Sequence, residues 1–256
     1  MQDSNTERPL TARSVLASIL LGTRPPELSG QRLVRAGELF GLAEGTTRVA
    51  LSRMVAAGEL SAEDGRYRLA GPLLARQRRQ EISRHPAPRD WDGAWAMAVL
   101  DRPGSRSPGE RIELRRALSG ARLAEWREGV WVRPDNLAEM DHHPTCTWLR
   151  AQLVETAEAA PLAARLWDLG GWLIRADRMR AQMAATIDPL EAGDPGALAP
   201  CFVTAAAVVR HVHADPLLPA EVLPATWPGA DLRADYDRYE AAYQSLLRTV
   251  LRGLER

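Results

Sequence analysis

The chain has 256 residues, of which 45% are hydrophobic and 26% are charged, and its formal net charge at pH 7 is +0. These values are ordinary for folded domains, so they exclude a disordered, collagen-like or highly charged chain, and the length allows two or three small domains. The N-terminal residues lack the basic and apolar runs of a signal peptide, and no apolar run approaches the roughly 18 residues that cross a bilayer. We therefore expect a cytoplasmic protein that does not insert into a membrane.

The distribution of charge is more informative than its sum. Residues 1–89 contain 14 Arg and 9 acidic residues, a balance of +5, whereas residues 90–256 contain 19 Arg and 24 acidic residues, a balance of −5. All 33 basic residues are Arg, so the abundance of Arg does not by itself indicate phosphate binding. A basic N-terminal part on an acidic remainder predicts that one end of the chain contacts nucleic acid.

The two cysteines, Cys146 and Cys201, lack the CxxC spacing of a metal-binding or redox motif. This pattern predicts neither a disulfide framework nor a zinc ribbon. Both residues are most simply interpreted as neutral thiols.

Three helices and a hairpin are predicted in the basic part. The apolar spacing predicts helices over residues 11–21, 29–40 and 44–57, and Ser29 can cap the second of them. Residues 60–69 contain an Asp-Gly pair, which is a strong signal for a hairpin turn. This order of elements is that of a winged helix-turn-helix.

The third helix carries the residue types of a major-groove reader. At about 100° per residue, its apolar side chains, among them Leu51 and Met54, gather on an arc that can pack against the first two helices. The opposite arc projects hydroxyl and Arg side chains, which suit phosphates and base edges, and a Val methyl group, which suits thymine. The DNA contacts that we predict on this helix are Thr46, Thr47, Arg48, Val49, Ser52 and Arg53.

The predicted hairpin supplies the wing. Arg66 and Arg68 flank Tyr67 directly after the turn, so alternation along the strand places both Arg side chains on one face and Tyr67 on the other. We predict that the two Arg residues contact the DNA backbone or the minor groove. The alternative is a small folded domain whose Arg residues are only solvated.

The remaining segments predict two further domains. Residues 71–84 form a solvated helix that leads to a linker at residues 85–88. Strands near residues 91–100, 123–126, 130–132 and 145–153, with a helix over residues 108–119 that turns Ile112, Ala117 and Leu118 inward, fit a ferredoxin-like sandwich. From about residue 157 the pattern is helical and ends in a long amphipathic helix whose apolar stripe runs from Leu232 to Leu254.

The fold class expected from these patterns is α+β, with three consecutive domains. Residues 1–84 form a winged helix DNA-binding domain, residues 89–156 form a ferredoxin-like middle domain, and residues 157–256 form an α-helical C-terminal domain for ligand binding or dimerisation.

Residues 44–58, EGTTRVALSRMVAAG, resemble the VRxALSRLxxxG signature of the PaaX family, the phenylacetate-degradation repressors of bacteria, with Thr47 in place of the usual Val. Residues 14–22, 91–95 and 129–136 also fit this family, and residues 215–229 are similar to its DPxLPxxLLPxxWPG stretch. Each motif is modest, but their order and spacing together are specific, and they cover nearly the whole chain.

The resemblance implies a bacterial repressor that binds a palindromic operator in double-stranded DNA as a homodimer. It also implies a small-molecule effector, phenylacetyl-coenzyme A or a related acyl-CoA, although no Gly-rich phosphate loop in the sequence locates its pocket. The chain contains no nucleophile-elbow or Walker pattern, and we expect no catalytic residue, no cofactor and no metal.

Rival sites remain open at the sequence level. Asp141, His142, His143 and Cys146 bring metal-ligand residue types together, but tetrahedral sites usually draw ligands from two separated segments, which favours a loop without metal. Asp101 follows the first middle-domain strand, where related CRISPR-associated nucleases place a metal-binding Asp. A metal-dependent nuclease or a protein-interaction scaffold built on the middle domain is therefore the alternative function.

The tryptophans allow two interpretations. Trp167 and Trp172 in the helical part, with Trp91, Trp95 and Trp131 in the middle domain, either line a pocket for an aromatic acyl group or pack in the core. Core or interface packing is the preferred interpretation for each of them.

Overall fold

The computed structural model describes residues 11–23, 25–101, 107–138, 140 and 142–253. Contacts divide the chain into two compact units: residues 1–84, 178–213 and 231–256 form the first unit, and residues 85–177 and 214–230 form the second. The first unit thus joins the N-terminal segment to the C-terminal helices. The three consecutive domains proposed from the sequence stay a prediction.

The first unit begins with three helices: α1 (Ala12–Gly22), α2 (Gly30–Glu38) and α3 (Glu44–Ala56). Thr11 caps α1 in a reciprocal capping box with Ser14, and the Ser29 side chain accepts from the backbone N–H of Arg32 at the start of α2. The three predicted helices are confirmed within two residues at each end.

A three-stranded antiparallel sheet completes the N-terminal segment. Its strands are β1 (Glu27–Ser29), β2 (Leu60–Glu63) and β3 (Arg66–Leu69), in the order β1-β3-β2. The hairpin turn places Asp64 and Gly65 at φ values of 48° and 71°, which is the backbone that the Asp-Gly pair predicts. The hairpin is therefore confirmed, whereas β1 is an additional strand that the sequence did not indicate.

Helices form the rest of the first unit: α4 (Gly71–Arg84), α8 (Leu198–His213), most of α9 (Gly229–Gly253) and the C-terminal part of α7 (Leu169–Glu191). The predicted apolar stripe of α9 is buried from Leu232 through Tyr243 to Leu246, and Leu254 lies outside the described residues. An edge-to-face contact joins Phe40, after α2, to Phe202 on α8, with ring centroids 5.1 Å apart. The C-terminal helices therefore share a core with the N-terminal segment.

One helical stretch of the described chain, Pro195–His213, is long and apolar enough to cross a membrane by length and composition. It consists of the 3-10 turn η2 (Pro195–Ala197) and α8. Core helices pass the same test, and Leu198, Cys201 and Val208 of this stretch are buried in the first unit. The hydropathy of the stretch agrees with its place in a core.

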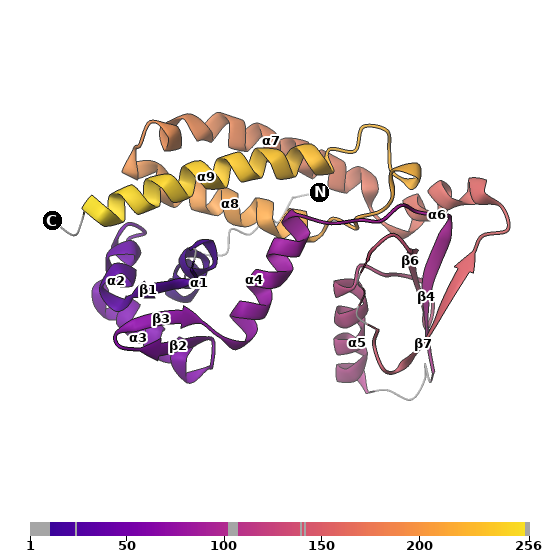
Figure 1. Cartoon of the computed structure of the whole chain (residues 1–256), viewed down its shortest axis with the longest axis horizontal. Coiled ribbons are helices and arrows are strands. Elements are labelled where there is room, and N and C mark those ends of the chain that lie inside the picture. The colour runs from indigo at the N-terminus through magenta and orange to yellow at the C-terminus, as the bar shows by residue number, and fades with distance from the viewer. Residues whose placement is uncertain (1–10, 24, 102–106, 139, 141, 254–256) are drawn as a thin grey trace. The chain divides into compact units, whose positions relative to one another are not determined.

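The second unit contains the sheet β4 (Ala94–Leu100), β5 (Ala124–Arg127), β6 (Val130–Pro134) and β7 (Cys146–Gln152), in the antiparallel order β5-β6-β4-β7. This is the strand order of a ferredoxin-like sheet, and the class of mixed helix and sheet is confirmed. Helix α5 (Pro108–Gly120) covers one face (Figure 1), and α6 (Ala159–Leu166) with η3 (Ala220–Val222) packs on the other; η1 (Thr156–Glu158) precedes α6.

Two predicted core positions of α5 are wrong. Ile112 is 61% exposed and Ala117 is also exposed, whereas Leu118 is buried as predicted. The second buried residue is Leu114, one turn before Leu118, because only one narrow stripe of this helix faces the sheet.

Candidate nucleic-acid interface

The exposed face of α3 brings three of the predicted contact residues together. Thr46, Val49 and Arg53 lie at i, i+3 and i+7 and line one shallow groove between α3 and the start of α1. All three side chains are exposed, and Val49 is 50% exposed, which is unusual for a residue of its type. The face presents a hydroxyl group, a branched apolar group and a guanidinium group to solvent.

A second stripe runs beside the first. The Arg48 guanidinium donates to the Glu44 carboxylate one turn earlier, at 2.7 Å between Nε and Oε1, and Ser52 lies one turn later. Arg48 and Ser52 are exposed. In contrast to Arg48, Arg53 forms no ion pair with any residue that the structure describes. Arg53 is therefore the cation on this face that has an open guanidinium.

Thr47 does not lie on this face, which corrects its prediction as a contact residue. Its side chain is fully buried, and its Oγ1 has no hydrogen-bond partner within the described chain. A Cβ atom at Gly37 of α2 would lie 2.7 Å from that oxygen, so α2 and α3 approach closely at this point. Thr47 packs between the two helices and its side chain cannot reach DNA.

The N-terminus of α3 is left open. Side chains cap α1 and α2, but the residue before α3 is Ala43, which makes no side-chain cap. The first backbone N–H groups of α3, which have no intrahelical acceptor at any helix start, therefore also lack a side-chain cap from the residue before the helix. Open N–H groups at a helix N-terminus attract phosphate oxygens.

The hairpin places Arg66 and Arg68 on one face, as alternation predicts, but both guanidinium groups are already engaged. Glu27 of β1 lies opposite Arg68 in the register, and its two carboxylate oxygens accept from the Nε atoms of Arg66 and Arg68. Hydrogen bonds from Arg68 and then Arg66 hold the pKa of Glu27 below its ordinary value. Sequence reasoning missed Glu27 because a three-residue strand carries no measurable alternation.

A second carboxylate moderates this surface further. Glu63 of β2 lies opposite Arg66 in the register, and Glu63, Arg66 and Arg68 line the same shallow hollow. The two positive charges of β3 thus lie between the carboxylates of Glu27 on β1 and Glu63 on β2. The surplus of positive charge expected of a DNA-binding wing is therefore much smaller than the two Arg residues alone imply.

The rival sites in the second unit show ordinary packing. Asp101 is exposed and accepts from Thr147 Oγ1 at 2.8 Å, while the ring of His142 stacks on Trp148 at 4.4 Å. Asp141 lies outside the described residues. Among the residues that are described, no group of three His, Cys, Asp or Glu side chains is placed to hold a metal ion.

The tryptophans pack against one another and into cores. Trp95 is buried between Trp91 and Trp167, Trp172 stacks on Trp227 with ring centroids 4.3 Å apart, and Trp131 is buried against α5. These contacts are the core packing that was the preferred interpretation.

Two motif stretches of the second unit hold each other through a buried Arg. Arg133, which is fully buried, donates to Asn136 Oδ1 at 2.9 Å and to the Leu217 carbonyl at 3.1 Å, and Asn136 donates to the same carbonyl at 3.0 Å. Burial lowers the pKa of Arg133 to about 9. The network fixes Leu217, whose φ is 50°, and joins residues 129–136 to residues 215–229.

Three family models match consecutive parts of the chain: the PaaX-like protein model at residues 11–73, the PaaX protein central Cas2-like domain at residues 88–161, and the PaaX-like protein C-terminal domain at residues 167–252. A solved structure of an uncharacterized protein from Mycobacterium tuberculosis is 41% identical, with a TM-score of 0.75 over 93% of this chain and 98% of that chain. No curated protein matches the sequence.

Proposed function

The chain belongs to the PaaX-like family of transcriptional regulators, which at the family level govern phenylacetic acid catabolism, and we propose that it binds double-stranded DNA through α3. The observation that carries this proposal is the exposed face of Thr46, Val49 and Arg53 beside an uncapped helix N-terminus. A helix of this kind fits the major groove with its N-terminal residues foremost. The N-terminal segment then acts as a winged helix-turn-helix.

Each group on α3 has a chemical role in this proposal. The open N–H groups at residues 44–46 bind a backbone phosphate and fix the register of the helix. Arg53 reads a guanine edge, since a guanidinium matches its two acceptors, and Val49 contacts a thymine methyl group. Arg48, Ser52 and the hairpin Arg residues contact the backbone.

Regulation is proposed on the strength of the family resemblance. A homodimer places two copies of α3 in successive major grooves, about 34 Å apart, which matches a palindromic operator. We propose that the protein is a repressor, released when phenylacetyl-coenzyme A or a related acyl-CoA shifts the dimer to a geometry that no longer fits both half-sites. We propose no catalytic role, no cofactor and no metal.

The test compares two Arg variants on DNA from upstream of the protein's own gene. Arg53→Ala should lower affinity by about 1–3 kcal/mol and relax discrimination at one base position, whereas Arg66→Ala should mainly reduce the salt slope, by about 1 or less because Glu27 is near. Arg248→Ala removes the same charge from an exposed position of α9, outside α3 and the hairpin, and serves as the control. If Arg53→Ala and Arg66→Ala both bind like the wild type across a salt series, α3 is not the reading helix.

A further inference from the structure

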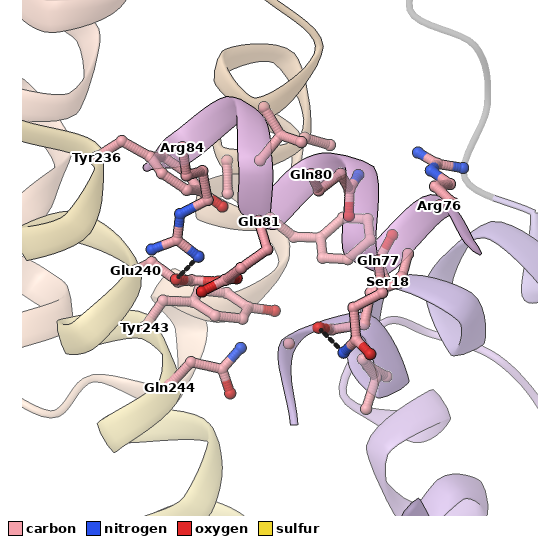
Figure 2. A pocket seen from close by; sticks show the side chains of 17 residues that line it. Ser18, Arg76, Gln77, Gln80, Glu81, Arg84, Tyr236, Glu240, Tyr243 and Gln244 are labelled. Atoms are coloured by element: carbon pink, nitrogen blue, oxygen red, sulfur yellow. Dashed lines mark hydrogen bonds and ion pairs between the residues drawn. The ribbon is translucent and has the colours of Figure 1, made fainter. Parts of the chain in front are cut away.

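A cavity of about 90 Å³ lies within the first unit, between α1, α4, α8 and α9. Figure 2 shows polar side chains from α4 and α9 around it, with Gln77 donating to the Leu21 carbonyl of α1 at 3.0 Å. Helix α1 packs directly against α3, and α4 follows the hairpin in the chain. The cavity thus adjoins the helices that support the candidate DNA-reading surface.

The hydroxyl group of Tyr243 is the strongest sign that the cavity has an occupant. Tyr243 is 6% exposed, and its hydroxyl has no hydrogen-bond partner within the described chain. In Figure 2 its ring projects from α9 toward Ser18 and Gln77, which places the hydroxyl in the wall of the cavity. A buried hydroxyl without a partner is unfavourable, and a ligand that pairs with it removes that cost.

The remainder of the wall favours an apolar body. Ile19 and Leu21 of α1, Phe202 and Val209 of α8, and the ring of Tyr236 line the cavity. Polar side chains form the rest of the wall, among them Ser18, Gln77 and Gln244, and an apolar surface with convergent polar groups is typical of small-molecule sites. The cavity is smaller than the roughly 150 Å³ apolar cavity that accommodates benzene, so it suits a body of about four carbons.

Charged side chains of both signs line the cavity: Arg76, Glu81 and Arg84 on α4 and Glu240 on α9. Arg84 donates to Asp237 at 2.6 Å and pairs with Glu240 at 2.5 Å, and it lies over the ring of Tyr236. The carboxylates of Asp237 and Glu240 repel an anion, and Arg84, which pairs with both, repels a cation. An uncharged oxygen acceptor is the group that pairs with Tyr243 without disturbing these ion pairs.

We propose that this cavity binds a small uncharged molecule with a branched aliphatic body and one amide or carbonyl oxygen, which accepts a hydrogen bond from the Tyr243 hydroxyl. A cavity of about 90 Å³ cannot enclose coenzyme A, and this proposal concerns a separate small ligand rather than the acyl-CoA effector proposed above. Because the occupant contacts α1 and α4, it stabilises the arrangement in which they support α3. That last consequence rests on the proposed DNA-binding function, whereas the binding site itself does not.

The test uses three probes of nearly equal shape and different charge: isobutyramide, isobutyrate and isobutylamine. Binding to the full chain is followed by ligand-observed and protein-observed NMR without DNA. A probe of about six non-hydrogen atoms is expected to bind with a millimolar Kd. Isobutyramide should bind, and the two charged probes should bind at least about tenfold more weakly because they disturb the Arg84 ion pairs.

Two variants identify the site. Tyr243→Phe keeps the ring and removes the hydroxyl, so it should weaken isobutyramide binding about tenfold without lowering the melting temperature. Ala206→Leu fills the cavity from α8 and should abolish binding, which keeps the proposal falsifiable if Tyr243→Phe fails to fold. Absence of isobutyramide binding, equal binding to both variants, or tighter binding of a charged probe overturns the proposal. Each of these outcomes leaves the DNA-binding assays of Arg53→Ala untouched, so the two proposals fail independently.

Discussion

Glu27 offers a direct test of how the hairpin meets DNA. Its carboxylate holds the Nε atoms of Arg66 and Arg68, and the side chain of Glu27 is only 11% exposed while the Arg side chains are 51% and 60% exposed. Glu27→Gln removes one negative charge and leaves the shape nearly unchanged. The hairpin face then has one more positive charge available to phosphates.

The magnitude follows from counterion release. One additional phosphate contact steepens the slope of log affinity against log salt by about 0.9, which corresponds to about eightfold tighter binding at 0.1 M salt. Fluorescence anisotropy with a fixed DNA fragment between about 50 and 200 mM salt measures both quantities. Glu221→Gln makes the same change in net charge at an exposed site of the second unit and is the matched control.

The opposite result has an equally clear meaning. If Glu27→Gln weakens binding and leaves the salt slope unchanged, Glu27 serves to orient the two guanidinium groups, and the neutralisation argument is refuted. Because the two Arg residues hold the pKa of Glu27 below its ordinary value, the carboxylate stays charged through the physiological range, and the effect of the substitution should not vary between about pH 6 and 8.

Three further predictions concern stability. Thr47→Val should raise the free energy of unfolding by about 1 kcal/mol, since it removes a buried hydroxyl without a partner, and should leave DNA affinity unchanged; a loss of affinity in anisotropy assays would show that Thr47 is a contact. Leu51→Ala should lower the free energy of unfolding, measured in urea, by about 2–5 kcal/mol because Leu51 is buried. Val49→Ala, at an exposed position, should lower it by less than about 0.5 kcal/mol. Equal losses for the two variants would contradict the placement of α3. Burial raises the pKa of Tyr243 above its ordinary value of 10.0, so above pH 10 the unfolded state releases a proton that the folded state retains, and the free energy of unfolding falls as the pH rises. Tyr243→Phe should reduce this fall in urea unfolding at alkaline pH. An unchanged fall would show that other groups cause it.

Local signals in the sequence sufficed for the elements that carry the candidate site. Helix caps such as Thr11 and Ser29 and the Asp64-Gly65 turn act within a few residues, so their positions follow from short-range chemistry. Thr47 shows where residue type misled: with Arg48 at zero, Thr47 falls at roughly 260° on the helical wheel, inside the apolar arc, and its hydroxyl alone had placed it among the contacts. The helical period was the better guide.

Long-range features were out of reach of the same reasoning. Glu27 reaches Arg66 and Arg68 across about forty positions of sequence because β1 pairs with β3, and a strand of three residues gives no pattern that announces the pairing. The packing of α8 and α9 in the core of the N-terminal segment could not be predicted for a similar reason. An apolar stripe indicates that one face of a helix is buried but does not identify the segment that buries it. In both cases the sequence does not show which segments, distant along the chain, pack against each other.

Charge in the first unit argues that recognition depends on the position of individual Arg residues. Many Arg residues of the basic N-terminal part already face carboxylates: Arg13 pairs with Glu59, Arg48 with Glu44, and Arg66 and Arg68 with Glu27. A guanidinium held by a carboxylate must exchange that partner for a phosphate, so its gain on binding DNA is small. Arg53 has no ion pair to exchange within the described chain, and its full interaction with a base edge adds to affinity. Arg53 on α3 is therefore the residue on which sequence discrimination should depend most, with the hairpin limited by Glu27 to a modest contribution from the DNA backbone.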